Sequence, residues 1–460
     1  MKKVIATLLA GLMLAGTVAG CSSQPSGNNP SKTDTESTGG NTGEEITLKL
    51  AIFKGGYGDS YWTPVQEAFQ KEYPNVKFEV QLDEQIGDLV KTQLNAGNVP
   101  DFIYCASNNT SGLMQAMIKS KQLMDITDLF EGELKEKIIP GFTDSATLQP
   151  YGDGKVYAAP IYYSTNGLWY NKTLFEEANL KVPTTLDEFW ALGEQLNSGE
   201  LLGKKRSLFT WQGQNPGYME TPILTTLLNH AGEDAVNAAF NFEDGAWSKD
   251  AMKEGLAFLP KLYNYTAEGV TGMEFTACEA LVKTGEALFV PCGNWIIGEL
   301  EKIDGEVING KDFEWGFAPV PVMDASKDKY IYSTVEEMYI PKDAKNADMA
   351  KKFLAFQYSD EAIKLNAEKT GGIPPVLGAA EKVKDTIIAK SGVSSYDAFS
   401  SFDQGYKAYM KGFATVDSNI NPKKEFYSPV ASVMDGSKSI DEWTKEADDR
   451  AAQLKDKIVK

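Results

Sequence analysis

The sequence is poor in the residues on which many enzymes and metal proteins depend. Its 460 residues include a single histidine, His230. One histidine excludes zinc sites built on histidine pairs and leaves any Ser-His-Asp or Cys-His site dependent on that residue. In the segment LLNHAGED it reads as a polar residue near a helix end. No G-x-S-x-G elbow occurs. We therefore expect no catalytic residue and no metal.

Positive charge and cysteine are also scarce. The chain carries 64 acidic and 45 basic residues, a net charge of −19. An acidic surface disfavours nucleic acid and anionic lipid as partners. Beyond Cys21 there are three unevenly spaced cysteines, Cys105, Cys278 and Cys292, which predict buried free thiols rather than a disulfide framework. The many carboxylates leave a glycosidase pair open, although no pair is singled out by its surroundings.

Nucleotide-binding motifs are incomplete. Residues 305–311 read GEVINGK, with the spacing of a phosphate-binding loop, but Asp312 follows where a Ser or Thr is required. A carboxylate there would repel phosphate instead of holding magnesium beside it. Residues 55–58, GGYG, lack the dinucleotide spacing. No cofactor is therefore expected.

The one long apolar run stands at the amino terminus. Lys2 and Lys3 precede the run 4–18, which is too short for a comfortable membrane span, so residues 1–20 read as a secretory signal peptide. Its ending, VAGC, resembles the lipobox of bacterial lipoproteins, which implies cleavage before Cys21 and a lipid on its sulfur. An ordinary signal with a free cysteine is the alternative. Residues 21–45 show no apolar pattern and predict a flexible tether.

From residue 46 on, strand and helix periods follow one another. Apolar side chains alternate over 46–50 and 76–82, and between them they repeat at a spacing of four over 65–73. This order is the strand-helix-strand unit of a parallel sheet. A capping box at 185–188 and a last helix from about residue 440 mark later helices. The sequence predicts an α/β fold, with helices on both faces of at least one sheet, and two or three domains.

An ordered series of short motifs runs along the chain. Residues 151–160 read YGDGKVYAAP, 167–172 read GLWYNK and 182–189 read VPTTLDEF. Weaker pieces keep the order: GNVPD at 97–101, GEAL at 285–288, GNW at 293–295, FAPVP at 317–321 and GGIP at 371–374. Over residues 46–460 the series resembles the extracellular solute-binding proteins of carbohydrate ABC importers, the group that contains maltose-binding protein.

The resemblance implies a two-lobe fold of the periplasmic-binding-protein type, with ligand in a cleft between the lobes. Lobe 1 would comprise 46–160 and 319–372, and lobe 2 would comprise 161–318 and 373–460, with crossings near 159–161, 317–319 and 370–373. It further implies a monomer without catalytic activity that delivers a small carbohydrate to the permease subunits of an ABC transporter. The lipid would hold it on the extracellular face of the cell membrane, which suggests a Gram-positive source.

The expected ligand contacts follow from what a neutral sugar offers. Its apolar C–H faces suit aromatic rings, and its polar edges suit hydrogen-bonding side chains. By match to the family, Trp295 is the expected aromatic contact, with Asn294 beside it. Asn108 and Asn109 match a charged pair in maltose-binding protein, and their amides put maltose itself in doubt. Cys105 stands where that relative has a cleft tryptophan, so one aromatic contact is lost.

Other contacts are implied by the same match. In the loop 211–218, Gln214 or Asn215 would take the polar role and Tyr218 the stacking role, while Trp211 is equally consistent with ligand contact and core packing. The remaining expected contacts are Tyr57, Tyr163, Glu336 (with Glu337 as alternative) and Tyr427 (with Phe426 as alternative). Trp190 and Trp443 lie on expected helices and should pack there.

The start GGYG looks like a subgroup that binds N-acetylglucosamine or short chitin oligomers, and xylo-, cello- and manno-oligosaccharides remain open. Two other functions stay as alternatives. An exported glycosidase would release product from an oligosaccharide. A binding protein for a non-sugar solute, such as a polyamine, would respond to no sugar, whereas a phosphodiester ligand is disfavoured because the matched positions lack basic residues.

Overall fold

The computed structural model describes residues 44–458, apart from residues 56, 108, 140, 144 and 418 and the side chain of Asp403. The expected signal peptide, the lipidation site Cys21 and the tether up to residue 43 lie outside the described residues. Residues 44–458 belong to one compact unit. No helix in this part of the chain has both the length and the apolar character needed to cross a membrane.

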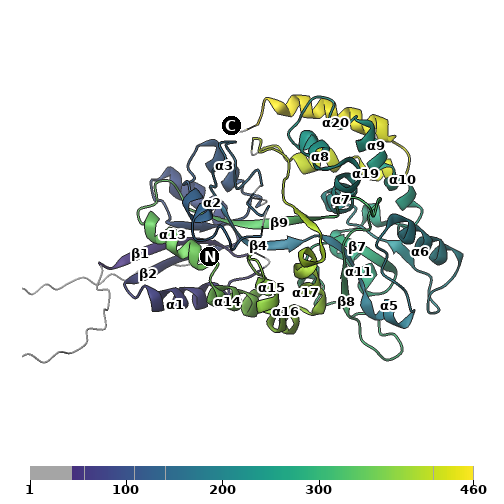
Figure 1. Ribbon diagram of the computed structural model, residues 1–460, viewed down its shortest axis with the longest axis horizontal. Helices are drawn as coiled ribbons and strands as arrows, with labels where there is room; N and C mark the ends of the chain where they lie inside the picture. The colour runs from purple at the N-terminus through teal and green to yellow at the C-terminus, as the bar shows by residue number, and fades with distance from the viewer. Residues whose placement is uncertain are drawn as a thin grey trace, which may run out of the picture. The chain divides into compact units, whose positions relative to one another are not determined.

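The first sheet begins with the predicted strand-helix-strand unit. Strand β1 (Ile46–Phe53) pairs in parallel with β2 (Val76–Asp83), in register from Ile46 opposite Val76. Helix α1 (Trp62–Glu72) connects them and buries one face of its apolar repeat. The short buried strand β3 (Phe102–Tyr104) pairs in parallel on the other edge of β1. The predicted unit is confirmed (Figure 1).

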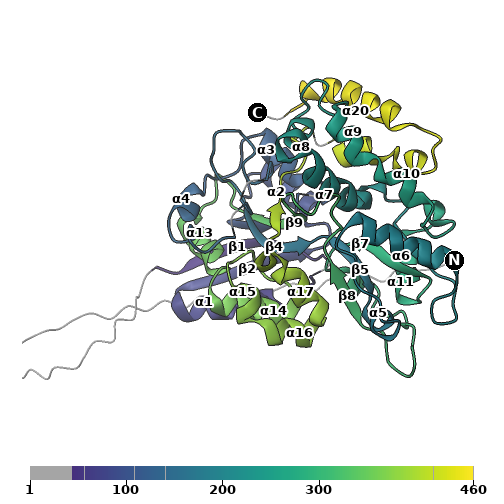
Figure 2. The same cartoon turned by 45° about the vertical axis from the view of Figure 1, so that its right-hand side comes forward.

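Two strands link the first sheet to a second one. Strand β9 (Tyr330–Tyr339) runs antiparallel to β3 and to β4 (Ala159–Thr165), and parallel to β10 (Lys407–Tyr409). Only Asn166 separates β4 from β5 (Gly167–Asn171), which belongs to the second sheet, of order β6-β7-β5-β8. In Figures 1 and 2, β4 and β9 run between the two sheets. The chain therefore changes sheets at residue 166.

The remaining elements are the other strands of the second sheet and the helices, which pack around both sheets (Figures 1 and 2). The strands of the second sheet besides β5 are β6 (Ser207–Phe209), β7 (Ala287–Cys292) and β8 (Trp315–Ala318). The helices are α2 (Ile86–Asn95), α3 (Leu113–Lys119), α4 (Thr127–Glu131), α5 (Lys172–Glu177), α6 (Leu186–Ser198), η1 (Pro216–Met219), α7 (Glu220–Ala231), α8 (Glu233–Phe240), α9 (Asp250–Leu256), α10 (Phe258–Tyr263), η2 (Val270–Gly272), α11 (Phe275–Lys283), α12 (Ile296–Glu299), α13 (Ala347–Phe356), α14 (Asp360–Thr370), α15 (Ala379–Lys382), α16 (Lys384–Ser391), α17 (Val393–Ser400), η3 (Ser401–Gln404), α18 (Pro422–Tyr427), α19 (Val430–Met434) and α20 (Ile440–Lys455).

Several local predictions are confirmed. Thr185 and Glu188 form the predicted capping box of α6, and the last helix begins at Ile440. His230 lies near the end of α7, with Nε2 3.0 Å from the carboxylate of Glu254. The three cysteines Cys105, Cys278 and Cys292 are free and buried. Each of these features depends on residues close together in the sequence or on the simple apolar character of a side chain.

Buried side chains form separate clusters around the two sheets. One large cluster surrounds β1 and β3 and includes Ile373, Ile387 and Phe399, although the predicted boundary places residues 373–460 in the second lobe. The other surrounds β5–β7 and includes residues up to Leu454. The lobe boundaries stay a prediction, because the packing in one conformation does not define which residues move together.

Candidate functional site

The point where the chain passes between the sheets gathers several of the expected ligand contacts. Asn294 follows β7, and its Oδ1 accepts a hydrogen bond of 3.0 Å from the backbone N–H of Thr165 at the end of β4. Its Nδ2 is buried and has no partner among the described residues. An unpaired buried donor is costly, so a ligand oxygen that reached Asn294 Nδ2 would remove this cost.

Trp295 lies directly beside this amide group. It is half-buried, precedes α12 and packs with the edge of the ring of Tyr218, at 6.4 Å between ring centroids and 69° between planes. The ring approaches the backbone of Gly293 so closely that a Cβ there would lie 2.2 Å from a ring carbon. The glycine is therefore required for this ring position. We refer to Tyr218, Asn294 and Trp295 as the Trp295 site.

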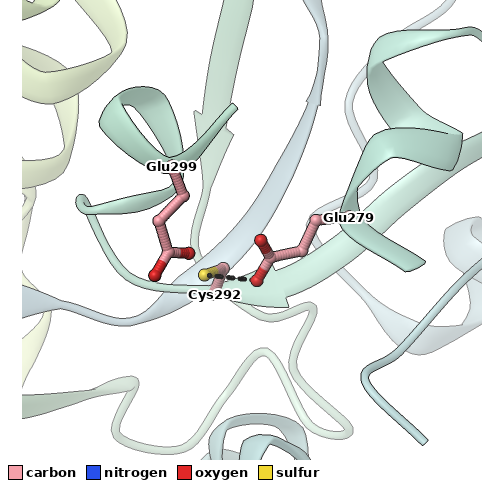
Figure 3. A group of neighbouring side chains, drawn as sticks. All are labelled: Glu279, Cys292 and Glu299. Carbon is pink, nitrogen blue, oxygen red and sulfur yellow. Dashed lines mark hydrogen bonds between the residues drawn. The ribbon is translucent and has the colours of Figure 1, made fainter. Parts of the chain in front are cut away.

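A cluster of acidic groups, with Glu279 and Cys292 buried and Glu299 exposed, lies next to the Trp295 site. Glu279 of α11, Cys292 of β7 and Glu299 of α12 have ligand atoms within 4.8 Å of one another (Figure 3). The thiol of Cys292 donates to Glu279 Oε1 at 3.4 Å, and Gln212 Nε2 donates to the same oxygen at 2.9 Å. No ion pair to either carboxyl occurs among the described residues.

Two carboxyl groups this close cannot both be ionised without a compensating positive charge. Burial, together with the nearby charge of Glu279, raises the pKa of Glu299 to about 8, and burial also raises the pKa of Glu279. Burial likewise raises the pKa of Cys292, so its thiol keeps its proton. These are the donor types that a zinc ion accepts. The raised pKa of Glu299 indicates that the pair holds a proton at neutral pH, which lowers its negative charge.

A second group of side chains lies along the same crossing strand. Tyr57 stacks on Tyr162 of β4, with ring centroids 3.8 Å apart and planes 7° from parallel. Gly372 fits against both rings, because a Cβ there would lie 2.7 Å from each. Tyr162 stands three residues before Thr165, so this group lies about 10 Å along β4 from the Trp295 site.

Glu336 and Glu337, the two alternatives for one expected ligand contact, differ in their burial and hydrogen bonds. Glu337 is buried and accepts hydrogen bonds from the backbone N–H of Ser107 at 2.8 Å and from Thr147 Oγ1 at 2.9 Å. Glu336 is half-buried, is the register partner of Tyr162 and accepts a hydrogen bond from the Tyr104 hydroxyl. Burial raises the pKa of Glu336 to about 7. Glu336 therefore lies in the tyrosine group, while Glu337 holds the fold.

Three expected contacts are buried in the hydrophobic clusters. Trp211 and Tyr163 are each 2% exposed, and Tyr427 is 1% exposed. Tyr163 contacts the ring edges of Phe142 and Phe399, and Tyr427 lies 3.5 Å from the carboxylate of Glu220. In this conformation a ligand reaches these side chains only after rearrangement. Their role in binding stays a prediction, as does that of the equally buried alternative, Phe426.

The remaining expected contacts are polar and more exposed. Gln214 donates to the backbone carbonyl of Gly272 at 2.9 Å, and Asn215 is exposed next to it. Asn109 is half-buried and accepts from the backbone N–H of Ser111 at 3.0 Å. Asn108 lies outside the described residues. Gln214 and Asn215 share the loop of Tyr218, whereas Asn109 follows β3.

Sequence reasoning missed Tyr162, Tyr104 and the Glu279–Glu299 pair. Neighbouring residues of a strand point to opposite faces. Tyr162 therefore stacks on Tyr57, while Tyr163 packs against Phe142 and Phe399, and both tyrosines are buried in the same hydrophobic cluster. The alternation of side chains along β4 predicts that Tyr162 and Tyr163 point to opposite faces of the sheet, but it does not show which tyrosine points to which face. No local signal joins Glu279 to Glu299, since they come together only through the packing of α11 and α12 on β7.

A cavity of about 380 Å³ lies apart from all of these groups. Its lining comes from the turn region 145–152, from α8 and the following Asn241, from the segment 411–415 and from Ile458; the lining residues are Ser145, Ala146, Gln149, Pro150, Tyr151, Gly152, Asn237, Phe240, Asn241, Lys411, Gly412, Ala414, Thr415 and Ile458. None of the expected ligand contacts among the described residues lies on its wall.

Comparisons with known proteins agree with one another. The profile of the family described as bacterial extracellular solute-binding protein matches residues 55–364. The diacetylchitobiose binding protein NgcE of Streptomyces coelicolor is 26% identical over 375 residues, covering 76% of each chain. An uncharacterized ABC transporter extracellular-binding protein of Pyrococcus horikoshii is 30% identical over 313 residues, covering 65% of this chain and 68% of its own.

Solved structures show the same fold. Apo RafE from Streptococcus pneumoniae superposes with a TM-score of 0.70 at 17% identity, covering 90% of this chain and 100% of its own. A chitin oligosaccharide binding protein superposes with a TM-score of 0.63 at 18% identity, over 90% and 100% of the two chains. The predicted α/β fold with two lobes is therefore confirmed.

Proposed function

Because this chain belongs to the bacterial extracellular solute-binding proteins, we propose that it captures a carbohydrate and delivers it to the permease of an ABC importer. The proposed ligand class is N-acetylglucosamine or its short oligomers. Support comes from the similarity to the diacetylchitobiose binding protein and from the GGYG segment after β1.

The observation that carries this proposal is the pairing of a half-buried aromatic ring with a buried amide donor that has no partner among the described residues. Trp295 offers apolar surface to the C–H face of a sugar, and Asn294 Nδ2 offers a donor to its hydroxyl or acetamido oxygen. The neighbouring carboxyl pair keeps a proton and so carries less charge than two free carboxylates. This set of groups suits a neutral ligand better than a polyamine.

The spacing along β4 favours an oligosaccharide. The Tyr57–Tyr162 stack with Glu336 lies about 10 Å along β4 from the Trp295 site, so only a ligand of linked sugar rings would reach both groups. A ligand that touches both groups would contact both sheets. Such a ligand shifts the population toward a closed arrangement by its higher affinity for that arrangement, and the permease then recognises the closed form.

We further propose that the protein performs no chemistry and is held by a lipid on Cys21 at the extracellular face of a Gram-positive cell membrane. Incubation with chitin oligosaccharides followed by chromatography tests the first point. Product release would favour the glycosidase alternative.

The decisive experiment is a titration of residues 44–460 with N,N′-diacetylchitobiose, followed by tryptophan fluorescence and calorimetry. Trp295→Ala should weaken binding by about tenfold or more, equivalent to at least 1.4 kcal/mol. Trp315→Ala is the matched control, because Trp315 is also half-buried against the same hydrophobic cluster and should leave affinity unchanged. Equal affinities of wild type and Trp295→Ala, with both proteins folded, would remove Trp295 from the site.

A further inference from the structure

The cavity away from the Trp295 site has the dimensions of a ligand site. Its volume of about 380 Å³ falls within the range of roughly 300–1,000 Å³ that is usual for small-molecule pockets. One wall is the turn region 145–152, whose Leu148 and Tyr151 pack in a cluster with β3. The opposite wall is formed by α8 and residues 411–415, which pack with the second sheet.

Both walls carry polar groups with unused hydrogen-bonding capacity. Gln149 Nε2 donates to the carbonyl of Thr143 at 3.1 Å, which leaves Gln149 Oε1 free to accept. Asn237 Oδ1 accepts from the Tyr409 hydroxyl at 2.7 Å, which leaves Asn237 Nδ2 free to donate. The side-chain amide of Asn241, one turn further along, makes no hydrogen bond within the described part of the chain, although its backbone N–H donates to the carbonyl of Asn237. The cavity thus presents both donors and acceptors.

The charge and the aromatic content of the wall narrow the ligand class. Among the described residues, no carboxylate lines the cavity, and the one charged side chain on its wall, Lys411, lies 3.3 Å from Glu233. Tyr151 is half-buried on one wall, whereas Phe240 on the other wall is packed into the hydrophobic cluster, so Tyr151 supplies the aromatic surface. A ligand with polar edges, apolar faces and no net charge satisfies this lining. A cation would find no carboxylate among the described lining residues, and an anion would have to compete with Glu233 for Lys411.

We propose that this cavity is a second carbohydrate site, which binds a separate saccharide molecule between the two walls. The inference rests on the proposed function for the class of ligand, but its residues are independent of the Trp295 site. A hydrogen bond of 3.3 Å already joins the two walls, since Thr415 Oγ1 donates to the carbonyl of Ala146. A saccharide in the cavity would strengthen this contact between the walls and so favour the arrangement in which they are close.

A blocking variant separates this site from the Trp295 site. Gly412 lines the cavity, and a Cβ built there meets no atom within 4 Å, so Gly412→Leu fills cavity space without a backbone clash. Gly199→Leu is the matched control, because its Cβ also meets nothing and Gly199 lies outside the cavity. Asn241→Ala is a second, milder variant that removes one exposed amide.

The experiment is calorimetry with N,N′-diacetylchitobiose on wild type, the two cavity variants, the control and Trp295→Ala. Wild type should show two binding events. Gly412→Leu should weaken one of them at least tenfold and Asn241→Ala should weaken the same event severalfold, while Trp295→Ala weakens the other. A single event that neither cavity variant changes overturns the second site and leaves the proposed function intact. Failure of wild type to bind any saccharide overturns both.

Discussion

The position of the Trp295 ring can be tested without removing the ring. Replacing Gly293 by alanine adds one methyl group beneath the indole, where the Cβ would lie 2.2 Å from one ring carbon and 2.5 Å from another. Backbone strain is not involved, because Gly293 has no positive φ. The ring must therefore move, or the turn between β7 and α12 must shift. Either change displaces the proposed sugar contact while every other side chain is retained.

The size of the effect follows from the required displacement. Ordinary contact begins at 3.4 Å, so the ring carbon at 2.2 Å has to recede by about 1.2 Å. A stacked aromatic contact is worth roughly 1–2 kcal/mol. Its loss corresponds to an increase in Kd of about five- to thirtyfold. Crowding of this kind should also lower the free energy of unfolding by roughly 1–3 kcal/mol.

The assay is a titration with N,N′-diacetylchitobiose, with the tryptophan emission maximum of the free protein recorded beforehand. Gly298→Ala is the matched control, since Gly298 lies on α12 and a Cβ there meets no atom within 4 Å. A shifted emission maximum combined with an unchanged Kd would refute the reasoning, because the ring would have moved without consequence for the ligand.

Two further predictions concern the carboxyl pair and the amino terminus. The pKa of Glu299 is raised from 4.5 to about 8, so between these values the folded protein holds a proton that the unfolded chain releases. The free energy of unfolding should therefore fall as the pH rises across this window, and Glu299→Gln should flatten the fall; solvent exposure limits the effect to roughly 1–2 kcal/mol. Equal slopes in urea unfolding of the two proteins would contradict the shared proton. For the anchor, Cys21→Ala should abolish fatty-acid labelling and release the protein from the membrane fraction into the medium, and retention of the variant on membranes would exclude lipidation at this residue.

The carboxyl pair connects stability to the proposed site. Glu299 belongs to α12, the short helix that Trp295 precedes, and its backbone N–H donates to the carbonyl of Trp295 at 3.1 Å. Ionisation of both carboxyl groups would place two negative charges beneath this helix. Ligand affinity and stability should therefore change over the same range of pH.

Much of the fold could be predicted because its signals are local. The parallel pairing of β1 and β2, the capping box of α6 and the start of α20 follow from periods and caps that span a few residues. The aromatic residues could be counted from the sequence, but the sequence did not show which of them pack in the core and which contact a ligand. Trp190 and Trp443 pack in the second hydrophobic cluster as predicted, and Trp211 joins them although its sequence context left its role open.

The sequence by itself determined the class of the molecule: an α/β protein with an ordered motif series and buried free thiols. Only the tertiary structure decided which polar and aromatic side chains meet. It stacked Tyr57 on Tyr162, set Glu337 into the fold and Glu336 among the tyrosines, and joined Glu279 to Glu299. The physical reason is that local periods specify strands and helices, whereas these meetings depend on how segments far apart in the chain pack across two sheets.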